Sequence, residues 1–282
     1  TVLLTFCANE KNNIMSEKMN IFNKEEIFKN PSRVFDIEIK AIHEIKDDCV
    51  FILDTNVLLL PYETNSDKLN AIRDTYKKIL EEGRLFIPAQ VAREFTSNRP
   101  TKLTELHHKL DQKRGKDLKI KREDYPIFQQ FKEYEELLTI EKQLKEVVRS
   151  YQEKISELIS IVEDWNWNDP ISSMYSEIFD STTIIDHSIS PEDIKKDKDY
   201  RYENKIPPGY KDGSKSDEGI GDYLVWLTII EYAKTHNSHI VFIGGDNKAD
   251  WFHRSNKIGI YPRYELIEEF YEASGGKSFH IK

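Results

Sequence analysis

Short apolar runs without polar alternation recur along the chain, and each ends abruptly at a polar or glycine residue. Cys49–Leu53, Leu85–Ile87 and His239–Ile243 are such runs, and a shorter one lies near Ser278–Ile281. A strand that is apolar on both sides is typical of a parallel sheet covered on both faces. The pattern therefore predicts four strands in a mostly parallel central sheet.

Helical periodicity fills the stretches between these runs. Ser66–Glu82 is amphipathic and is followed by Gly83 as a stop, and Pro88 stands where the next helix begins. Two further helices are expected over Asp217–Lys234 and Pro262–Ala273. Because strands and helices alternate, the sequence predicts an α/β fold, a three-layer α/β/α sandwich with helices on both faces of the sheet.

The domain organisation follows from where this alternation starts. Residues 1–48 are expected to form a helical N-terminal extension, with helices over Lys24–Lys29 and Val34–Ile45 capped by Asn23 and Ser32. Residues 49–282 are expected to form one domain.

Two segments of that domain depart from the alternation. From about residue 100 to 170 the pattern is long, charged and helical, which predicts a helical hairpin inserted into the domain. Residues 186–215 are polar and contain three prolines, which favours a loop.

Charge is unevenly distributed along the chain. The formal net charge is −9, yet the stretch from Arg99 to Arg122 is strongly basic. Lys113, Arg114, Lys116 and Lys119 are the candidates for contacts with a phosphate backbone. A solvated helical face explains the same residues equally well.

The two cysteines, Cys7 and Cys49, give neither a disulfide framework nor a zinc spacing. The apolar stretch Thr1–Ala8 lacks a preceding basic region and is not interpreted as a signal peptide. No apolar run approaches the length of a membrane span. A cytoplasmic protein is therefore expected.

Four acidic residues are expected to converge at one edge of the sheet. Asp54 directly follows the first apolar strand, Asp246 lies just past the third, Asp222 lies early in its helix, and Glu94 lies on the helix after the second strand. Ligands of open parallel sheets gather at the carboxyl ends of the strands. Crowded carboxylates need a compensating cation, and oxygen ligands favour Mg²⁺ or Mn²⁺. Such ions suit phosphodiester hydrolysis.

Each acid also has an ordinary structural explanation. Asp54 and Asp246 could be turn formers, and Glu94 could lie on a solvated helical face. Asp222 could simply stabilise the N-terminus of its helix through the helix dipole. Only the combination of the four points to a site.

The residues around these acids resemble the motifs of PIN-domain nucleases. Leu53–Leu58 (LDTNVL) and Val91–Phe95 (VAREF) look like the first and second motifs. Gly221–Trp226 (GDYLVW) is similar to the third, and Ile243–Asp246 (IGGD) to the fourth. The match is best to a larger bacterial PIN-like group with a helical insertion, of which Pro207–Asp212 (PPGYKD) also looks like a feature.

This resemblance implies a metal-dependent endoribonuclease. It implies Asp54, Glu94, Asp222 and Asp246 as catalytic, metal-binding acids. Thr55 would have a supporting role, and Asn56 and Asp250 are further candidates for one. Asp217 could extend the acidic cluster, but capping of the following helix explains it better. Two departures are evident: Gly244 replaces a Thr or Ser of many members, and Asp250 lies later than the corresponding acid of the small toxin-type members.

Other functions stay open on the sequence alone. The same acids would serve a PIN-like nuclease that acts on DNA, and the fold could be a catalytically silent nucleic-acid-binding module. A phosphatase with Asp54 as nucleophile would require a second Asp where Asn56 stands. RNA is the expected partner. A regulatory protein partner is compatible with this interpretation, and the oligomeric state is open.

Overall fold

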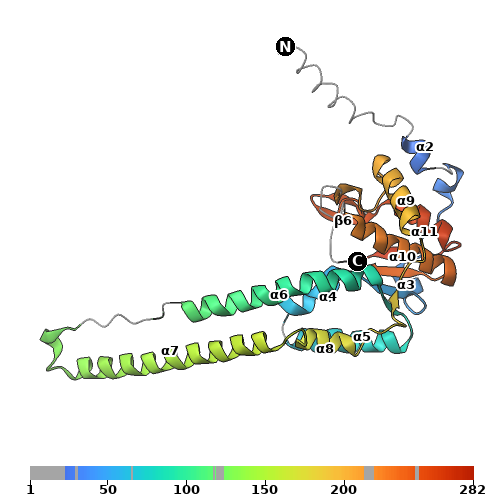
Figure 1. The fold of residues 1–282 in the computed structure, drawn as a ribbon. Helices are drawn as coiled ribbons and strands as arrows, with labels where there is room; N and C mark the ends of the chain where they lie inside the picture. The colour runs from blue at the N-terminus through green and yellow to red at the C-terminus, as the bar shows by residue number, and fades with distance from the viewer. Residues whose placement is uncertain are drawn as a thin grey trace, which may run out of the picture. The chain divides into compact units, whose positions relative to one another are not determined.

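The computed structural model describes residues 23–28, 31–64, 66–116, 118, 124–212, 219–244 and 248–282 (Figure 1). The chain divides into two compact units. The first consists of Thr1–Leu58, Tyr76–Arg93 and Asp180–Lys282, and the second of Leu59–Thr75 and Glu94–Phe179. In the described residues, no helix is long and apolar enough to cross a membrane.

A five-stranded sheet forms the centre of the first unit. Its order is β3 (Ile184–Ile185), β2 (Leu85–Pro88), β1 (Val50–Leu53), β4 (Ile240–Ile243) and β7 (Phe279–Ile281), and all neighbours are parallel. The apolar runs thus form the strands that they predicted. They are buried because helices cover both sides of the sheet.

Helices lie on both faces of this sheet. On one face are α10 (Ile220–His236) and α11 (Tyr264–Ala273), where the rings of Trp226 and Phe270 lie 5.2 and 5.1 Å from that of Phe279. On the other face, Ile45 of α3 (Ile42–Ile45) packs with Cys49 and Val241. The expected α/β/α arrangement is confirmed.

Two short helices follow β1 directly. They are α4 (Thr55–Leu59) and the 3-10 helix η2 (Leu60–Glu63). The predicted amphipathic helix is α5 (Ser66–Glu81), and Gly83 after it adopts a positive φ of 68°. A glycine in this left-handed conformation ends helices at little cost.

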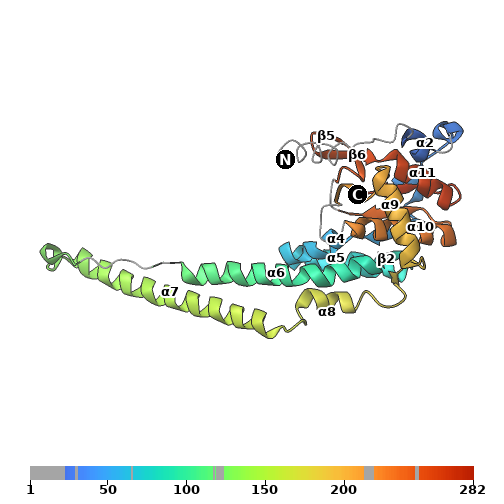
Figure 2. The same cartoon turned by 45° about the horizontal axis from the view of Figure 1, so that its top comes forward.

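The second unit is built around a pair of long helices. α6 (Ala89–Gly115) has its residues from Glu94 onward in this unit, and α7 (Lys132–Asp164) returns along it (Figures 1 and 2). Gln152 donates to the carbonyl of Arg114 over 3.2 Å and so ties the two helices together. The short helices η3 (Pro126–Phe128) and α8 (Pro170–Ser176) precede and follow α7. The helices expected between residues 100 and 170 are therefore present.

Asp169 organises the end of this unit. It caps α8 by accepting from the backbone N–H groups of Ile171 and Ser172 at 3.0 and 3.1 Å. Its carboxylate also accepts from the Tyr62 hydroxyl at 3.0 Å and from Arg99 Nε at 2.7 Å. Asp169 is fully buried and Arg99 nearly so, which makes this ion pair a buried one.

Two sequence predictions are wrong. The pattern predicts one helix over Val34–Ile45, but the structure has α2 (Asn23–Ile27), the 3-10 helix η1 (Pro31–Phe35), a segment without regular secondary structure and the single turn of α3. Ser32 therefore caps no helix. Lys29 lies outside the described residues.

The loop expected over 186–215 contains a thirteen-residue helix, α9 (Pro191–Glu203). Ser190 caps it by accepting from the N–H of Asp193 at 3.2 Å, and Pro191 occupies a favoured first-turn position. Its buried face consists of Ile194, Lys198 and Arg201. Because two of these three are cationic, the apolar periodicity is hidden in the sequence. The 3-10 helix η4 (Tyr210–Asp212) follows.

An antiparallel hairpin that the sequence pattern does not predict lies between the third apolar strand and the last helix. It comprises β5 (Phe252–Ser255) and β6 (Ile258–Pro262). Its turn residues Asn256 and Lys257 both have positive φ, 48° and 68°. Lysine is an unusual residue at that position, where glycine is the common signal.

Candidate metal centre

Asp54 stands at the carboxyl edge of the sheet. Its backbone N–H donates to the carbonyl of Ile243 over 2.9 Å, which continues the β1–β4 ladder by one residue. Its own carbonyl accepts from the N–H groups of Val57 and Leu58. Asp54 is therefore the junction at which the strand becomes helix α4, and its side chain is held at the sheet's edge.

Asp222 lies in the first turn of α10, where a negative charge is favoured by the helix dipole. Both carboxylate oxygens accept from the ammonium of Lys248, at 2.9 and 2.8 Å. Lys248 follows the fourth acidic motif by two positions. It was not among the predicted site residues, and a lysine in a polar turn carries no sequence signal of such a role.

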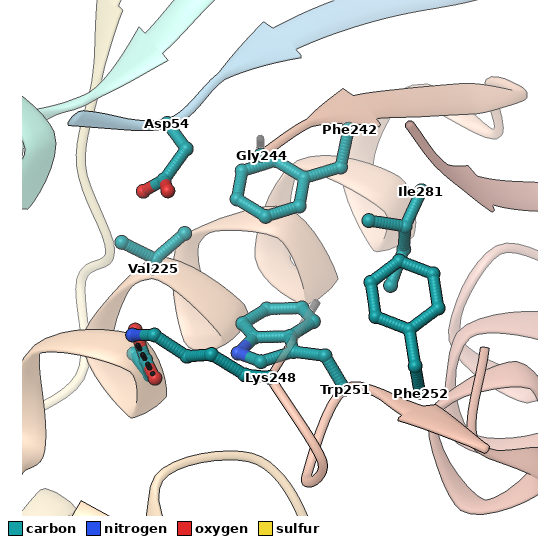
Figure 3. Close-up of a pocket in the computed structure, with 9 residues that line it drawn as sticks. Asp54, Val225, Phe242, Gly244, Lys248, Trp251, Phe252 and Ile281 are labelled. Carbon is teal, nitrogen blue, oxygen red and sulfur yellow. Dashed lines mark hydrogen bonds and ion pairs between the residues drawn. The ribbon is translucent and has the colours of Figure 1, made fainter. Parts of the chain in front are cut away.

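Asp54, Asp222 and Lys248 line one cavity with a volume of about 20 Å³, room for a single water-sized group. Figure 3 shows the Asp54 carboxylate and the Lys248 side chain at this pocket, and the Lys248 ammonium pairs with Asp222. The rest of the wall is largely apolar: Val225, Phe242, Gly244, Trp251, Phe252 and Ile281. Charged groups thus face one another against a hydrophobic wall, where electrostatic interactions are strong.

Asp250 directly precedes Trp251 of the cavity wall and is only 2% exposed. Its carboxylate accepts from the backbone N–H of Gly209 at 2.8 Å. Burial raises the pKa of the Asp250 carboxyl, and the negative charge of Asp222 raises it further. Asp250 therefore anchors the segment Pro207–Asp212 and adds to the negative potential around Asp222.

Gly209 is required where this anchored segment approaches α9 and α10. Its φ is +92°, and a Cβ at this position would lie 2.6 Å from the hydroxyl oxygen of Tyr202. That hydroxyl donates to the carbonyl of Gly219 at 2.9 Å, just before α10 begins. The glycine thus permits the contact that fixes the start of the helix carrying Asp222.

An ionic network around the nearly buried Arg201 holds α10 through Tyr223 and Trp226. Arg201 donates to Glu269 at 3.1 Å, and the indole N–H of Trp226 donates to the same carboxylate at 2.8 Å. Tyr223 donates to Asp197, which also accepts from Arg201 at 2.9 Å. Burial raises the pKa of the Tyr223 phenol, so it stays a hydrogen-bond donor. Most of these partners are far apart in the chain, so no local sequence pattern indicates them.

The supporting residues next to Asp54 differ in exposure. Thr55 is buried, whereas Asn56 is exposed and donates to the Asp54 carboxylate at 3.4 Å. Gly244 leaves space, because a Cβ there would make only ordinary contacts with Phe242, at 3.5 Å or more. A Cβ is therefore tolerated at this position.

Apart from Asp54 and Asp222, no predicted acid that the structure describes lines this cavity. Glu94 is half-buried in α6 and begins the stretch Glu94–Phe179 of the second unit, whereas the residues that line the cavity belong to the first unit. Its part in the acidic cluster therefore stays a prediction. Asp246 and Asp217 lie outside the described residues. Their roles stay predictions as well.

The basic candidates lie at the end of α6, in the second unit. Lys113 and Lys116 line a hollow of about 400 Å³ together with Lys109. Arg114 forms an ion pair with Asp111. Lys119 lies outside the described residues. Three ammonium groups around one hollow form a surface of the charge that a phosphate backbone requires.

The donor chemistry of the cavity suits a hard divalent cation. Among the described residues, no three side chains of the metal-binding types gather at one point. Two carboxylates do line the cavity, and Mg²⁺ is commonly held by one or two carboxylates with waters completing its shell. Asp54 and Asp222 are therefore the described residues that could hold Mg²⁺ or Mn²⁺.

Comparison with known protein families gives one match. The family described as "PIN like domain" matches residues 50–266, which is more than half of the chain. No curated protein and no solved structure matches the chain.

Proposed function

Because the chain belongs to the PIN-like domain family, whose fold is of the nuclease type, we propose that it is a metal-dependent endoribonuclease. It hydrolyses phosphodiester bonds of RNA with Mg²⁺ or Mn²⁺ as its cofactor. The observation that carries the proposal is the meeting of the Asp54 and Asp222 carboxylates at one cavity. Glu94 and Asp246 are the proposed additional acids.

The chain's own residues divide the work as follows. Asp54 and Asp222 present their oxygens from the strand edge and the helix start, where together they would hold the divalent ion. When bound, the divalent ion supplies activation of a water and neutralisation of the departing oxygen. The apolar residues Trp251, Phe252 and Ile281 line the same cavity, and apolar surroundings strengthen the electrostatic interactions of the carboxylates. The product is a 5′-phosphate, and no residue forms a covalent bond to the substrate.

Lys248 adds a positive charge to the same cavity. Its ammonium forms an ion pair with the Asp222 carboxylate. Because it borders the cavity, the same ammonium is placed to pair with a phosphate oxygen once Asp222 is engaged elsewhere. Farther along the substrate, Lys113, Arg114, Lys116 and Lys119 are the proposed contacts with the RNA backbone.

The test is cleavage of single-stranded RNA, single-stranded DNA and a DNA flap, each with Mn²⁺ or with EDTA. We expect cleavage of RNA with Mn²⁺ alone and 5′-phosphate ends. Asp54→Asn and Asp222→Asn should abolish it, whereas Asp67→Asn, an exposed acid on α5, should retain full activity. Cleavage of DNA but not of RNA would show that the substrate is DNA and would refute the proposed RNA substrate. Full activity in both site variants would refute the assignment of these acids.

The basic hollow is tested by binding. Replacing Lys113, Arg114, Lys116 and Lys119 with Ala should weaken RNA binding. It should also flatten the salt dependence of the affinity, by roughly 0.7 in the log–log slope for each phosphate of a single strand that the protein no longer neutralises. Unchanged binding and slope would identify these residues as an ordinary solvated face.

A further inference from the structure

Helix α7 carries a second apolar stripe that faces solvent. Its inner face is buried within the second unit through Tyr134, Ile155 and Ile159. The other stripe, here called the outer seam, consists of residues that are 43–64% exposed: Leu137, Ile140, Leu144, Val147, Tyr151, Leu158 and Ile161. Its spacing alternates between three and four residues, and Lys154 occupies the one heptad position that is not apolar.

This spacing distinguishes the outer seam from ordinary surface residues. Single exposed leucines are common and need no explanation. Apolar residues at alternating three- and four-residue steps over 25 residues are the pattern of a coiled-coil interface. In the unit that contains α7, the inner face packs on α6, as the contacts of His107 with Glu163 and Gln152 with Arg114 show. Figures 1 and 2 show these two helices side by side.

We propose that the outer seam is covered by the same seam of a second copy of this chain, with the two α7 helices antiparallel and their two-fold axis at Arg149. An isologous dimer requires a surface that is complementary to itself. The seam meets this requirement because its spacing is the same when read from either end. Leu137 then packs on Ile161 of the second copy, Ile140 on Leu158, and Val147 on Tyr151.

The charge within the seam favours the antiparallel orientation. In a parallel, in-register pair, Lys154 would face Lys154 of the other copy, and two ammonium groups would repel each other in an apolar interface. In the antiparallel pair it faces Leu144 instead. There its methylene stem can cover apolar surface while the ammonium reaches water.

The area of the seam is sufficient for a reversible dimer. Full burial of a large apolar side chain removes roughly 60–120 Å² from water, and a half-exposed one can still bury about half of that area. Seven such side chains on each of two copies would therefore bury about 400–800 Å². The stems of the flanking charged side chains bring the total towards the roughly 1,200 Å² at which stable interfaces begin. An interface of this size fits a weak, reversible dimer.

Sedimentation equilibrium of the full chain tests the proposal. At tens of micromolar we expect twice the chain mass of 33.2 kDa. Ile140→Glu with Ile161→Glu should raise the dissociation constant at least about 100-fold, because four carboxylates would enter one apolar interface. The matched control is Thr139→Glu with Ser160→Glu, which adds the same charges at neighbouring exposed positions with the same spacing. This control should leave the dimer intact.

Cysteine cross-linking tests the orientation. In a Cys7→Ser background, where the remaining Cys49 is buried, Leu137→Cys with Ile161→Cys should give a covalent dimer under oxidation. Leu137→Cys alone should not, because its two copies would lie at opposite ends of the seam. A covalent dimer from the single variant would overturn the antiparallel arrangement. A protein that stays monomeric up to about 100 µM would overturn the interface, even if the seam were found to bind RNA instead. A dimer that survives the Ile140 and Ile161 substitutions would overturn it as well.

Discussion

Replacing Lys248 with methionine tests whether Asp222 exchanges an ammonium for a metal ion. Lys248 contacts both oxygens of Asp222 at 2.8–2.9 Å, and the two side chains are 31% and 19% exposed. A fully exposed pair contributes about 0.2–1 kcal/mol, whereas breaking a buried pair costs about 3–5 kcal/mol. A half-buried pair of good geometry lies between these values, at about 1–2 kcal/mol.

The same pair acts in opposite directions on stability and on metal binding. Without metal, Lys248→Met should lower the free energy of unfolding by about 1–2 kcal/mol, since Asp222 loses its partner near Asp54 and Asp250. With metal, the cation no longer displaces an ammonium. If all of that energy is recovered on binding, the affinity for Mn²⁺ rises about 5- to 30-fold.

Calorimetric titration with Mn²⁺ and urea unfolding in EDTA measure the two effects. Lys234→Met, at an exposed position on the last turn of α10, is the control that removes the same charge. Its Mn²⁺ affinity should equal that of the unaltered protein. Unchanged or weaker Mn²⁺ binding in Lys248→Met, with the expected loss of stability, would refute the reasoning that Lys248 and the metal compete for Asp222.

Two further predictions concern stability away from the cavity. Asp169→Ala removes the cap of α8 and leaves Arg99 buried without its carboxylate, so urea unfolding should show a loss of about 3–5 kcal/mol; a loss below about 1 kcal/mol would contradict a buried pair. Burial lowers the pKa of His239 from its ordinary 6.5, and its Nδ1 accepts from the N–H of Ser278. The unfolded state therefore binds the proton first, so stability from this group is complete above about pH 6.5 and declines as the pH falls towards the folded pKa. Unfolding measured from pH 7.5 to 5 should show this decline, and His239→Asn, which cannot titrate, should reduce it; identical slopes would exclude His239 as the cause.

The sequence predicted the part of the fold that depends on local pattern. The runs before Asp54 and Gly244 are apolar on both faces, which is typical of strands in a parallel sheet covered on both sides. Their carboxyl ends meet at one edge, which is why the sequence alone could place Asp54 at that edge as a candidate site residue. The same argument placed Asp222 near that edge, because helices after parallel strands begin there.

The parts that were missed depend on contacts between distant residues. Helix α9 buries Lys198 and Arg201, whose charges mask the helical period, and Arg201 finds its carboxylate partner 68 residues away at Glu269. Lys248 reaches Asp222, 26 residues away in the chain, only in the folded protein. For α7, the sequence contains both apolar stripes, but only the structure tells which stripe is buried and which is exposed.

The most direct test of the proposed metal centre is anomalous diffraction from crystals soaked in Mn²⁺. We expect one strong peak within about 2–2.5 Å of carboxylate oxygens of both Asp54 and Asp222, with the Lys248 ammonium displaced from Asp222. A peak bound elsewhere, or no peak at a Mn²⁺ concentration that supports cleavage, would contradict a metal centre built on these two acids.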